Sequence, residues 1–136
     1  MNEPRNIVQP IGKILVMEEE ESIRKMIVRL LTQKGFEVVC AKDGAEAIGL
    51  YQSDHALQQS FDAVILDLTV TFGMGAKTTI KQLLKIDPDV KVIVSSGYHF
   101  DDVIVNPCKY GFCGAITKPF SSSELVAIIN RTIENE

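Results

Sequence analysis

The chain of 136 residues is predicted to fold as a doubly wound α/β domain, with a five-stranded parallel sheet flanked by about five helices. Two patterns predict this class. Short apolar segments alternate with longer amphipathic segments along the chain. One short segment, residues 63–66, is apolar at every position, which is typical of a strand covered on both faces. We expect a tail or linker over residues 1–12. The chain shows no internal repeat, and its length fits one domain, which we expect over residues 13–136.

Five short apolar segments predict the strands. They are too short for helices and are rich in β-branched side chains, which favour extended backbone. The expected strands cover residues 14–17, 36–40, 63–66, 90–94 and 113–116.

The longer segments between the strands predict the helices. In the first, apolar side chains recur at helical spacing over residues 23–31, and Lys34-Gly35 ends the helix. Asn106-Pro107 interrupts the fourth, because proline cannot donate a backbone hydrogen bond. Serines at 121–123 cap the last one. The expected helices cover residues 22–31, from Asp43-Gly44 into the high 50s, 77–86, 100–110 and 124–133.

Composition excludes several classes of protein. A hydrophobic content of 46% with 24% charged residues is that of a globular domain. The net charge of −4 gives no reason to expect nucleic-acid binding. No apolar stretch approaches the roughly 20 residues that cross a bilayer, and the first residues lack a signal-peptide pattern. Three cysteines without CxxC spacing favour free thiols over a disulfide framework or a zinc site. We therefore expect a cytoplasmic domain that makes no membrane contact.

Charged and hydroxyl side chains follow four of the predicted strands. Glu18 and Glu19 follow the first, Asp67 the third, Ser96 the fourth and Lys118 the fifth. Each residue alone has an ordinary interpretation as a turn, a helix cap or a solvated side chain. Because the carboxyl ends of parallel strands share one edge, where ligands bind, we expect the five side chains to meet in one cleft.

Phosphoryl transfer requires these residue types together. A carboxylate such as that of Asp67 can attack phosphorus and form an acyl phosphate. Negative charge on the transferred group can be balanced by Mg2+ held on carboxylates, by Lys118 and by a hydroxyl such as that of Ser96. The pattern predicts phosphate and metal chemistry centred on Asp67.

The chain resembles the receiver domain of two-component response regulators, a flavodoxin-like fold, over residues 13–134. The sequence of these segments is most similar to receivers fused to hybrid sensor histidine kinases. This similarity implies either a fused kinase in a longer parent chain or a stand-alone relative. The segments that carry the resemblance are Ile14-Leu15-Val16-Met17-Glu18-Glu19-Glu20-Glu21-Ser22-Ile23-Arg24, Ile65-Leu66-Asp67-Leu68-Thr69, Val92-Ile93-Val94-Ser95-Ser96-Gly97-Tyr98 and Thr117-Lys118-Pro119-Phe120.

The resemblance implies that Asp67 accepts a phosphoryl group from a histidine kinase or a phosphotransfer protein. Glu18 and Glu19 would form the acidic pair that binds Mg2+, and the backbone carbonyl of Thr69 would complete the metal shell together with Asp67. Such a domain is not an enzyme in the usual sense, since it catalyses only its own phosphorylation and dephosphorylation. Its output would run through protein contacts.

The resemblance also implies roles for residues after the last two strands. Ser96 takes the position of the switch hydroxyl, with Ser95 as the second choice. Lys118 takes the position of the phosphate-binding lysine, and we expect a cis bond between it and Pro119. Thr69 and Tyr98 fall at the positions that influence water access to the acyl phosphate.

The chain departs from the family pattern in its acidic pair and at position 115. The family usually has at least one aspartate in the acidic pair, whereas this chain has Glu18 and Glu19. Each glutamate adds a methylene, roughly 1.3–1.5 Å of reach, and Mg2+ tolerates little departure from octahedral geometry. We therefore expect weakened metal binding, and a glutamate can instead reach Lys118. Ala115 stands where an aromatic switch residue is common, so we expect output to depend on movement of residues 97–110, with Tyr98 or Phe112 as candidates for part of that role.

Other functions remain open at this point. A degenerate receiver acting as a phosphorylation-independent interaction module is supported by the glutamate pair and Ala115, and opposed by the presence of Asp67, Ser96 and Lys118. A haloacid dehalogenase-like phosphatase would need a second aspartate where Thr69 stands. A nucleotide- or flavin-binding protein would need a loop rich in glycine or hydroxyl groups after the first strand, where four glutamates stand.

Overall fold

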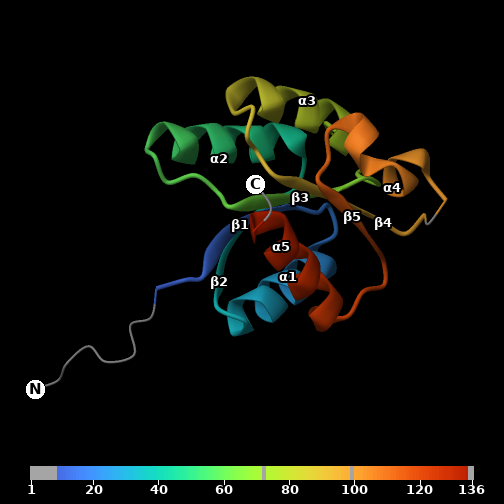
Figure 1. Ribbon diagram of the computed structural model, residues 1–136, viewed down its shortest axis with the longest axis horizontal. Coiled ribbons are helices and arrows are strands. Elements are labelled where there is room, and N and C mark those ends of the chain that lie inside the picture. Colours follow the sequence, from blue (N-terminus) through green and yellow to red (C-terminus); the bar gives the residue numbers. More distant parts are fainter. Residues whose placement is uncertain (1–8, 72, 99, 135–136) are drawn as a thin grey trace, which may run out of the picture.

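The computed structural model describes residues 9–71, 73–98 and 100–134. It contains one five-stranded parallel sheet in the order β2-β1-β3-β4-β5, which confirms the predicted fold class. Helices α2, α3 and α4 cover one face of the sheet, and α1 and α5 cover the other (Figure 1). The elements are β1 (Gly12–Met17), α1 (Glu21–Gln33), β2 (Phe36–Ala41), α2 (Gly44–Ala56), β3 (Ala63–Asp67), α3 (Ala76–Ile86), β4 (Val92–Ser96), α4 (Asp102–Val105), the 3-10 helix η1 (Pro107–Tyr110), β5 (Gly114–Thr117) and α5 (Ser122–Glu134).

The strand register aligns the ends that were predicted to carry the site. Met17 pairs with Leu66, so β1 and β3 end side by side. Asp67 pairs with Ser95, and Ser96 pairs with Thr117. All residues of β3 and β4 are buried, as their apolar sequences predict for strands covered on both faces. The carboxyl ends of four strands therefore meet at one edge.

Two hydrophobic cores hold the layers together, one on each face of the sheet. In both, the apolar stripe of each helix packs on side chains that alternate along the strands. The core beneath α2, α3 and α4 includes Leu15, Leu66, Tyr51, Ile80, Leu83 and Phe112. The core beneath α1 and α5 includes Ile14, Ile65, Leu31, Leu125 and Ile129.

Several boundaries differ from those expected from the sequence. β1 begins at Gly12, within the predicted tail, of which residues 1–8 lie outside the described part. β4 begins at Val92 rather than residue 90, because Val90 donates its N–H to the carbonyl of Asp87 in the turn that ends α3. The predicted helix over residues 100–110 is split at Asn106-Pro107 into α4 and η1, as the proline indicated.

The helix caps follow the sequence signals. Asp43 accepts a hydrogen bond from the N–H of Glu46 at 3.0 Å and begins α2. Before α5, Ser121 Oγ accepts from the N–H of Glu124 at 3.1 Å. The Glu124 carboxylate accepts in return from the N–H of Ser121 at 2.8 Å, which completes a capping box.

None of the helices within residues 9–71, 73–98 and 100–134 combines the length and the hydropathy that a membrane span requires.

The loop that follows β3 is packed closely against the start of α2. Gly44 donates its N–H to the carbonyl of Met74 at 2.9 Å. A Cβ atom at Gly44 would lie 1.9 Å from Thr79 Oγ1, and a Cβ at Gly73 would lie 2.7 Å from an oxygen of Asp43. Gly73 also has φ of +85°, a conformation that favours glycine. These two glycines allow the loop and the helix to approach.

We expect Gly44→Ala to destabilise the domain by about 1–3 kcal/mol, because the added methyl group must displace Thr79 or Met74. Urea denaturation measures the effect. The matched control is Gly49→Ala in the same helix, where an added Cβ meets nothing within 4 Å. That control should stabilise by about 0.5–1 kcal/mol, since alanine favours helix. Equal effects of the two substitutions would contradict the close packing at Gly44.

Candidate functional site

Asp67 lies at the end of β3 and is buried, with 2% of its surface exposed. Its Oδ1 accepts hydrogen bonds from the N–H of Thr69 at 3.1 Å and from the Thr69 hydroxyl at 2.8 Å. Its Oδ2 lies 3.4 Å from Lys118 Nζ. The carboxylate is thus oriented through one oxygen by its own loop, while the other oxygen faces a cation.

Glu18 follows β1 and is as deeply buried as Asp67. Its backbone N–H donates to the carbonyl of Ala41 at 2.9 Å, which extends the pairing of β1 with β2 by one residue. Its Oε1 accepts from Lys118 Nζ at 2.7 Å, and its Oε2 accepts from the N–H of Glu20 at 3.2 Å. A buried carboxylate and an ammonium group joined at this distance form a charge-assisted hydrogen bond.

Lys118 follows β5 and brings Glu18 and Asp67 together. Its N–H donates to the carbonyl of Ser96 at 2.9 Å, which fixes its position beside β4. Its Nζ is closer to Glu18 than to Asp67, at 2.7 and 3.4 Å. The bond between Lys118 and Pro119 is cis, as expected from the sequence. The structure therefore places one cation between two buried acids at the carboxyl edge of the sheet.

The pKa values of the ion pair reflect its burial. Loss of hydration raises the pKa of Glu18 above its usual range and outweighs the hydrogen bonds from Lys118 and Glu20. Burial acts against the charge of Lys118, but the hydrogen bond with Glu18 and the charge of Asp67 together raise the pKa of this lysine. The lysine therefore stays charged at neutral pH, as a phosphate-binding role requires.

Glu19, the second member of the acidic pair, lies at the surface side of this cluster and is partly buried. Its Oε1 accepts from the N–H of Thr71 at 2.7 Å, which ties the loop after β1 to the loop after Asp67. Glu18 and Glu19, adjacent in the sequence, thus hold different partners.

Arg24 in α1 supports the same loop and was not singled out from the sequence. Its Nη1 donates to the carbonyls of Glu18 and Glu19, both at 2.8 Å. A basic side chain in the first turns of a helix opposes the helix dipole. That local disadvantage was the available signal that Arg24 has a partner outside its helix.

The predicted hydroxyl residues lie at the end of β4. Ser96 is fully buried, and its Oγ accepts from the N–H of Tyr98 at 3.0 Å. Ser95, the second choice, is 4% exposed, and its carbonyl accepts from the N–H of Leu68 at 2.8 Å. The Ser96 hydroxyl therefore accepts from a backbone N–H, and it retains one proton that a hydroxyl can donate.

The other predicted positions follow β4 or lie in and before β5. Tyr98 is 67% exposed on the loop after β4. Ala115 is partly buried in β5 and packs on the core that contains Phe112. Phe112 is itself buried in that core, so of the two aromatic candidates only Tyr98 is at the surface.

The arrangement of the acids does not form a metal shell. Among the described residues, no three Asp, Glu, His or Cys side chains gather as a metal site. Every buried side-chain oxygen or nitrogen in that part of the chain also has a hydrogen-bond partner. Glu18 is bonded to Lys118 and Glu19 to Thr71. The oxygen chemistry suits Mg2+, but the carboxylates present are committed to protein partners.

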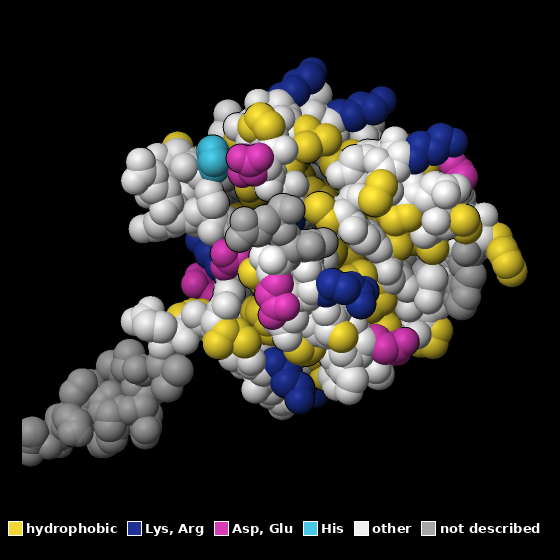
Figure 2. All heavy atoms as spheres, viewed as in Figure 1, with side chains coloured by type: hydrophobic (Ala, Val, Ile, Leu, Met, Phe, Trp, Pro, Cys, Tyr) yellow, Lys and Arg dark blue, Asp and Glu magenta, His cyan; other side chains and the backbone are white. Residues whose placement is uncertain are grey.

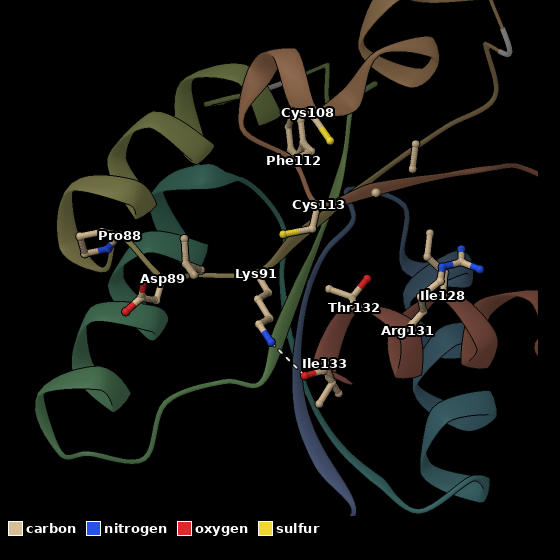
Figure 3. Close-up of a pocket in the computed structure, with 13 residues that line it drawn as sticks. Pro88, Asp89, Lys91, Cys108, Phe112, Cys113, Ile128, Arg131, Thr132 and Ile133 are labelled. Carbon is tan, nitrogen blue, oxygen red and sulfur yellow. Dashed lines mark hydrogen bonds between the residues drawn. The ribbon is translucent and has the colours of Figure 1, made fainter. Parts of the chain in front are cut away.

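A cavity of about 810 Å3 lies at the amino ends of β4 and β5, away from the carboxyl edge that carries the ion pair. Its walls come from the residues that precede β4 and β5 and from the last turns of α5 (Figure 3). Lys91 crosses it and donates to the carbonyl of Ile133 at 2.9 Å. Cys108 and Cys113 lie on its rim as free thiols. None of the residues predicted to carry phosphate chemistry lines this cavity. Ala115, which departs from the family pattern, does line it.

We expect Lys118→Met to destabilise the domain by about 3 kcal/mol at neutral pH, because Glu18 and Asp67 would remain buried without a cation. The matched control is Lys25→Met, which removes an exposed pair with Glu21 and should cost no more than about 0.5 kcal/mol. Denaturation of both variants measures the difference.

The pH dependence of Lys118→Met gives a second measurement. Burial raises the pKa of Glu18, and Lys118 partly offsets that rise. Removal of Lys118 therefore raises the pKa further, so the native variant binds a proton more readily than either the native wild type or the unfolded state. Acidification therefore favours the native state of the variant, and its deficit relative to wild type should shrink as the pH falls toward the usual carboxyl range. A deficit independent of pH would show that the ion pair is not its cause.

Comparison with known proteins agrees with this geometry. The family of the response regulator receiver domain matches residues 14–130. Chemotaxis protein CheY of Bacillus subtilis is 30% identical over 122 residues, which cover 89% of this chain and 97% of CheY. Sensor kinase CckA of Brucella abortus is 31% identical over 126 residues, which cover 90% of this chain and only 13% of the kinase.

A solved structure agrees as well. The receiver domain of a sensor histidine kinase from Pseudomonas aeruginosa, with a magnesium ion coordinated in its active-site cleft, superposes with a TM-score of 0.79 at 21% identity. The superposition covers 91% of this chain and 98% of that domain. The match to the family over most of the domain and the identity with CheY establish that this chain belongs to the receiver domain family of two-component response regulators.

Proposed function

We propose that this receiver domain accepts a phosphoryl group on Asp67 from a histidine kinase or a phosphotransfer protein, in a cytoplasmic two-component pathway. The observation that carries the proposal is the position of Lys118 Nζ, within 3.4 Å of Asp67 at the carboxyl edge of the sheet. The edge of a doubly wound sheet is where such folds bind ligands.

In the proposed reaction, a carboxylate oxygen of Asp67 attacks phosphorus of the phosphohistidine donor. A P–O bond forms, the P–N bond breaks, and the donor imidazole leaves with the electron pair and takes up a proton. Oδ1 is held by Thr69, which orients the carboxylate and leaves Oδ2 on the side of Lys118. The Lys118 ammonium then holds one phosphoryl oxygen, and the Ser96 hydroxyl donates to another.

The proposed reaction has a cost, which arises from the hydrogen bond between Lys118 and Glu18. Lys118 is bonded to Glu18 at 2.7 Å, so it must shift from that carboxylate to hold the phosphoryl group. The movement is small, since the Glu18 and Asp67 carboxylates both lie within 3.4 Å of Lys118 Nζ. The domain would catalyse only its own phosphorylation and dephosphorylation, and its output would run through protein contacts.

The alternative, a receiver that works as an interaction module without phosphorylation, is weakened by the same cluster. A buried ion pair with two acids and one lysine is costly to maintain and contributes little net stability. Asp67, Ser96 and Lys118 nevertheless all lie at the edge where phosphate chemistry requires them.

We expect Asp67→Asn to abolish phosphorylation, because the amide is not a nucleophile for phosphorus. Purified protein is incubated with acetyl phosphate, with and without Mg2+, and the mass of the intact chain is measured. The matched control is Asp62→Asn, five residues earlier at the amino end of β3, whose carboxylate accepts from the N–H of Lys13. Mass gain in wild type and in this control, and none in Asp67→Asn, is the expected result. Absence of gain in all three proteins would overturn the proposal.

Mg2+ binding remains a prediction of the family resemblance, with Glu18, Glu19, Asp67 and the Thr69 carbonyl as its ligands. Metal binding by Glu18 requires its carboxylate to leave Lys118, so the affinity should be low. Aspartate at positions 18 and 19 is shorter by one methylene and reaches Lys118 less well. We therefore expect the Glu18→Asp/Glu19→Asp variant to bind Mg2+ about tenfold more tightly, a difference of about 1.4 kcal/mol.

Isothermal titration of both proteins measures this affinity directly and does not depend on phosphorylation. Saturation of the wild type at the same Mg2+ concentration as the aspartate variant would contradict the idea that Lys118 and the metal compete for Glu18.

A further inference from the structure

Helix α3 presents a row of three lysines to solvent. Lys77, Lys81 and Lys85 follow one another at intervals of four residues and therefore share one face of the helix. All three are exposed. The opposite face, which includes Ile80 and Leu83, is buried in the core. The amphipathic pattern of α3 requires polar side chains on this face. It does not require that all three of them be lysine.

The positive charge of this lysine row contrasts with the negative net charge of the whole chain. Residues 68–86 contain three lysines and no acidic residue, whereas the whole chain has a net charge of −4. Within the described residues, no ion pair involves any of these three lysines, in contrast with Lys25 of α1, which pairs with Glu21. Figure 2 shows basic side chains along the upper rim of the molecule, over α3 in Figure 1. Like charges at this spacing repel one another, so the row has an unfavourable local energy.

A groove lies beside this row, between α3 and η1. It is a cavity of about 260 Å3 lined by Lys77, Ile80, Lys81, Lys109 and Tyr110. The ammonium groups of Lys77 and Lys109 both lie 5.6 Å from the centre of the Tyr110 ring. Gly111, with φ of +96°, lets η1 approach, since a Cβ there would lie 3.1 Å from Leu84. The groove thus combines the half-buried ring of Tyr110 with three lysines, while Ile80 beneath it is buried in the core.

Two residues of the groove, Lys109 and Tyr110, are bonded to one acidic residue. The Asp102 carboxylate accepts from Tyr110, Asn106 and Lys109, and these hydrogen bonds lower its pKa to about 2. It offsets the charge of Lys109 and holds the Tyr110 hydroxyl. In the described part of the chain no carboxylate forms an ion pair with the three lysines of α3, although Asp101 lines a neighbouring cavity together with Lys77.

We propose that this surface, the α3 row with its groove, docks an acidic segment of a partner protein. Lysines four residues apart on a helix are separated by about 6 Å along its axis. Carboxylates on alternate residues of an extended segment are separated by about 6.6–6.8 Å, which matches that interval. Nucleic acid is the less favoured polyanion, because the net charge of −4 repels it.

The location of the surface connects it to the predicted phosphorylation site. Lys77 also lines a second cavity, with Leu68, the residue that follows Asp67. The other wall, η1, belongs to the segment that follows Ser96. A docked segment would therefore contact elements downstream of both residues. The proposal itself goes beyond phosphorylation and does not require it.

The test uses the full chain and two probes, a fluorescent oligoglutamate peptide and an oligothymidylate of matched charge. Binding is measured by fluorescence anisotropy at low and at physiological salt. Lys81→Gln/Lys85→Gln removes two charges from the row, and Lys34→Gln/Lys42→Gln removes two exposed charges elsewhere. At low salt we expect the first variant to bind oligoglutamate about fivefold more weakly than wild type and the control less than about twofold more weakly.

Chemical-shift changes on adding oligoglutamate should map to α3 and η1, and physiological salt should weaken the binding. Three results would overturn the proposal. These are no saturable binding at low salt, an equal loss in the control variant, or tighter binding of oligothymidylate than of oligoglutamate. Because no step involves Asp67, failure of phosphorylation would leave this test unaffected.

Discussion

The site of this domain depends on the register of its parallel strands. The pairs Asp67–Ser95 and Ser96–Thr117 bring together the ends of strands that are distant in sequence. Side chains alternate along a strand, so a slip of one residue would move Asp67 to the other face of the sheet. The register is in turn maintained by the two cores, because each strand has apolar side chains on both faces. The position of one carboxylate is therefore a result of packing over the whole sheet.

The alternation of strands and helices was predictable from the sequence because both patterns are local. Apolar segments such as residues 63–66 and the caps at Asp43 and Ser121 carry their signal within a few residues. The start of β4 was misplaced by two residues, because Val90 is apolar but belongs to a turn. Which apolar residue first pairs with a neighbouring strand is a tertiary property.

The location of the site was predictable from the sequence, but the ion pair between Lys118 and Glu18 was not. Strand ends mark where Asp67, Glu18 and Lys118 should meet, since the carboxyl edge is common to all strands. Which acid holds the lysine depends on side-chain length and on contacts between residues 100 positions apart. The sequence raised this pairing as one option among several. A basic residue early in a helix indicates that Arg24 has a partner outside that helix, but not that the partners are two consecutive carbonyls.

The close packing of Gly73 and Gly44 also bears on how this chain can vary. Surface loops usually accept insertions, because their backbone makes few fixed contacts. The loop after Asp67 is different, since Gly44 is bonded to the carbonyl of Met74 and Gly73 lies against Asp43. An added residue would break that bond or drive a side chain into the cap of α2. This segment is therefore a poor place to insert a tag or a second domain.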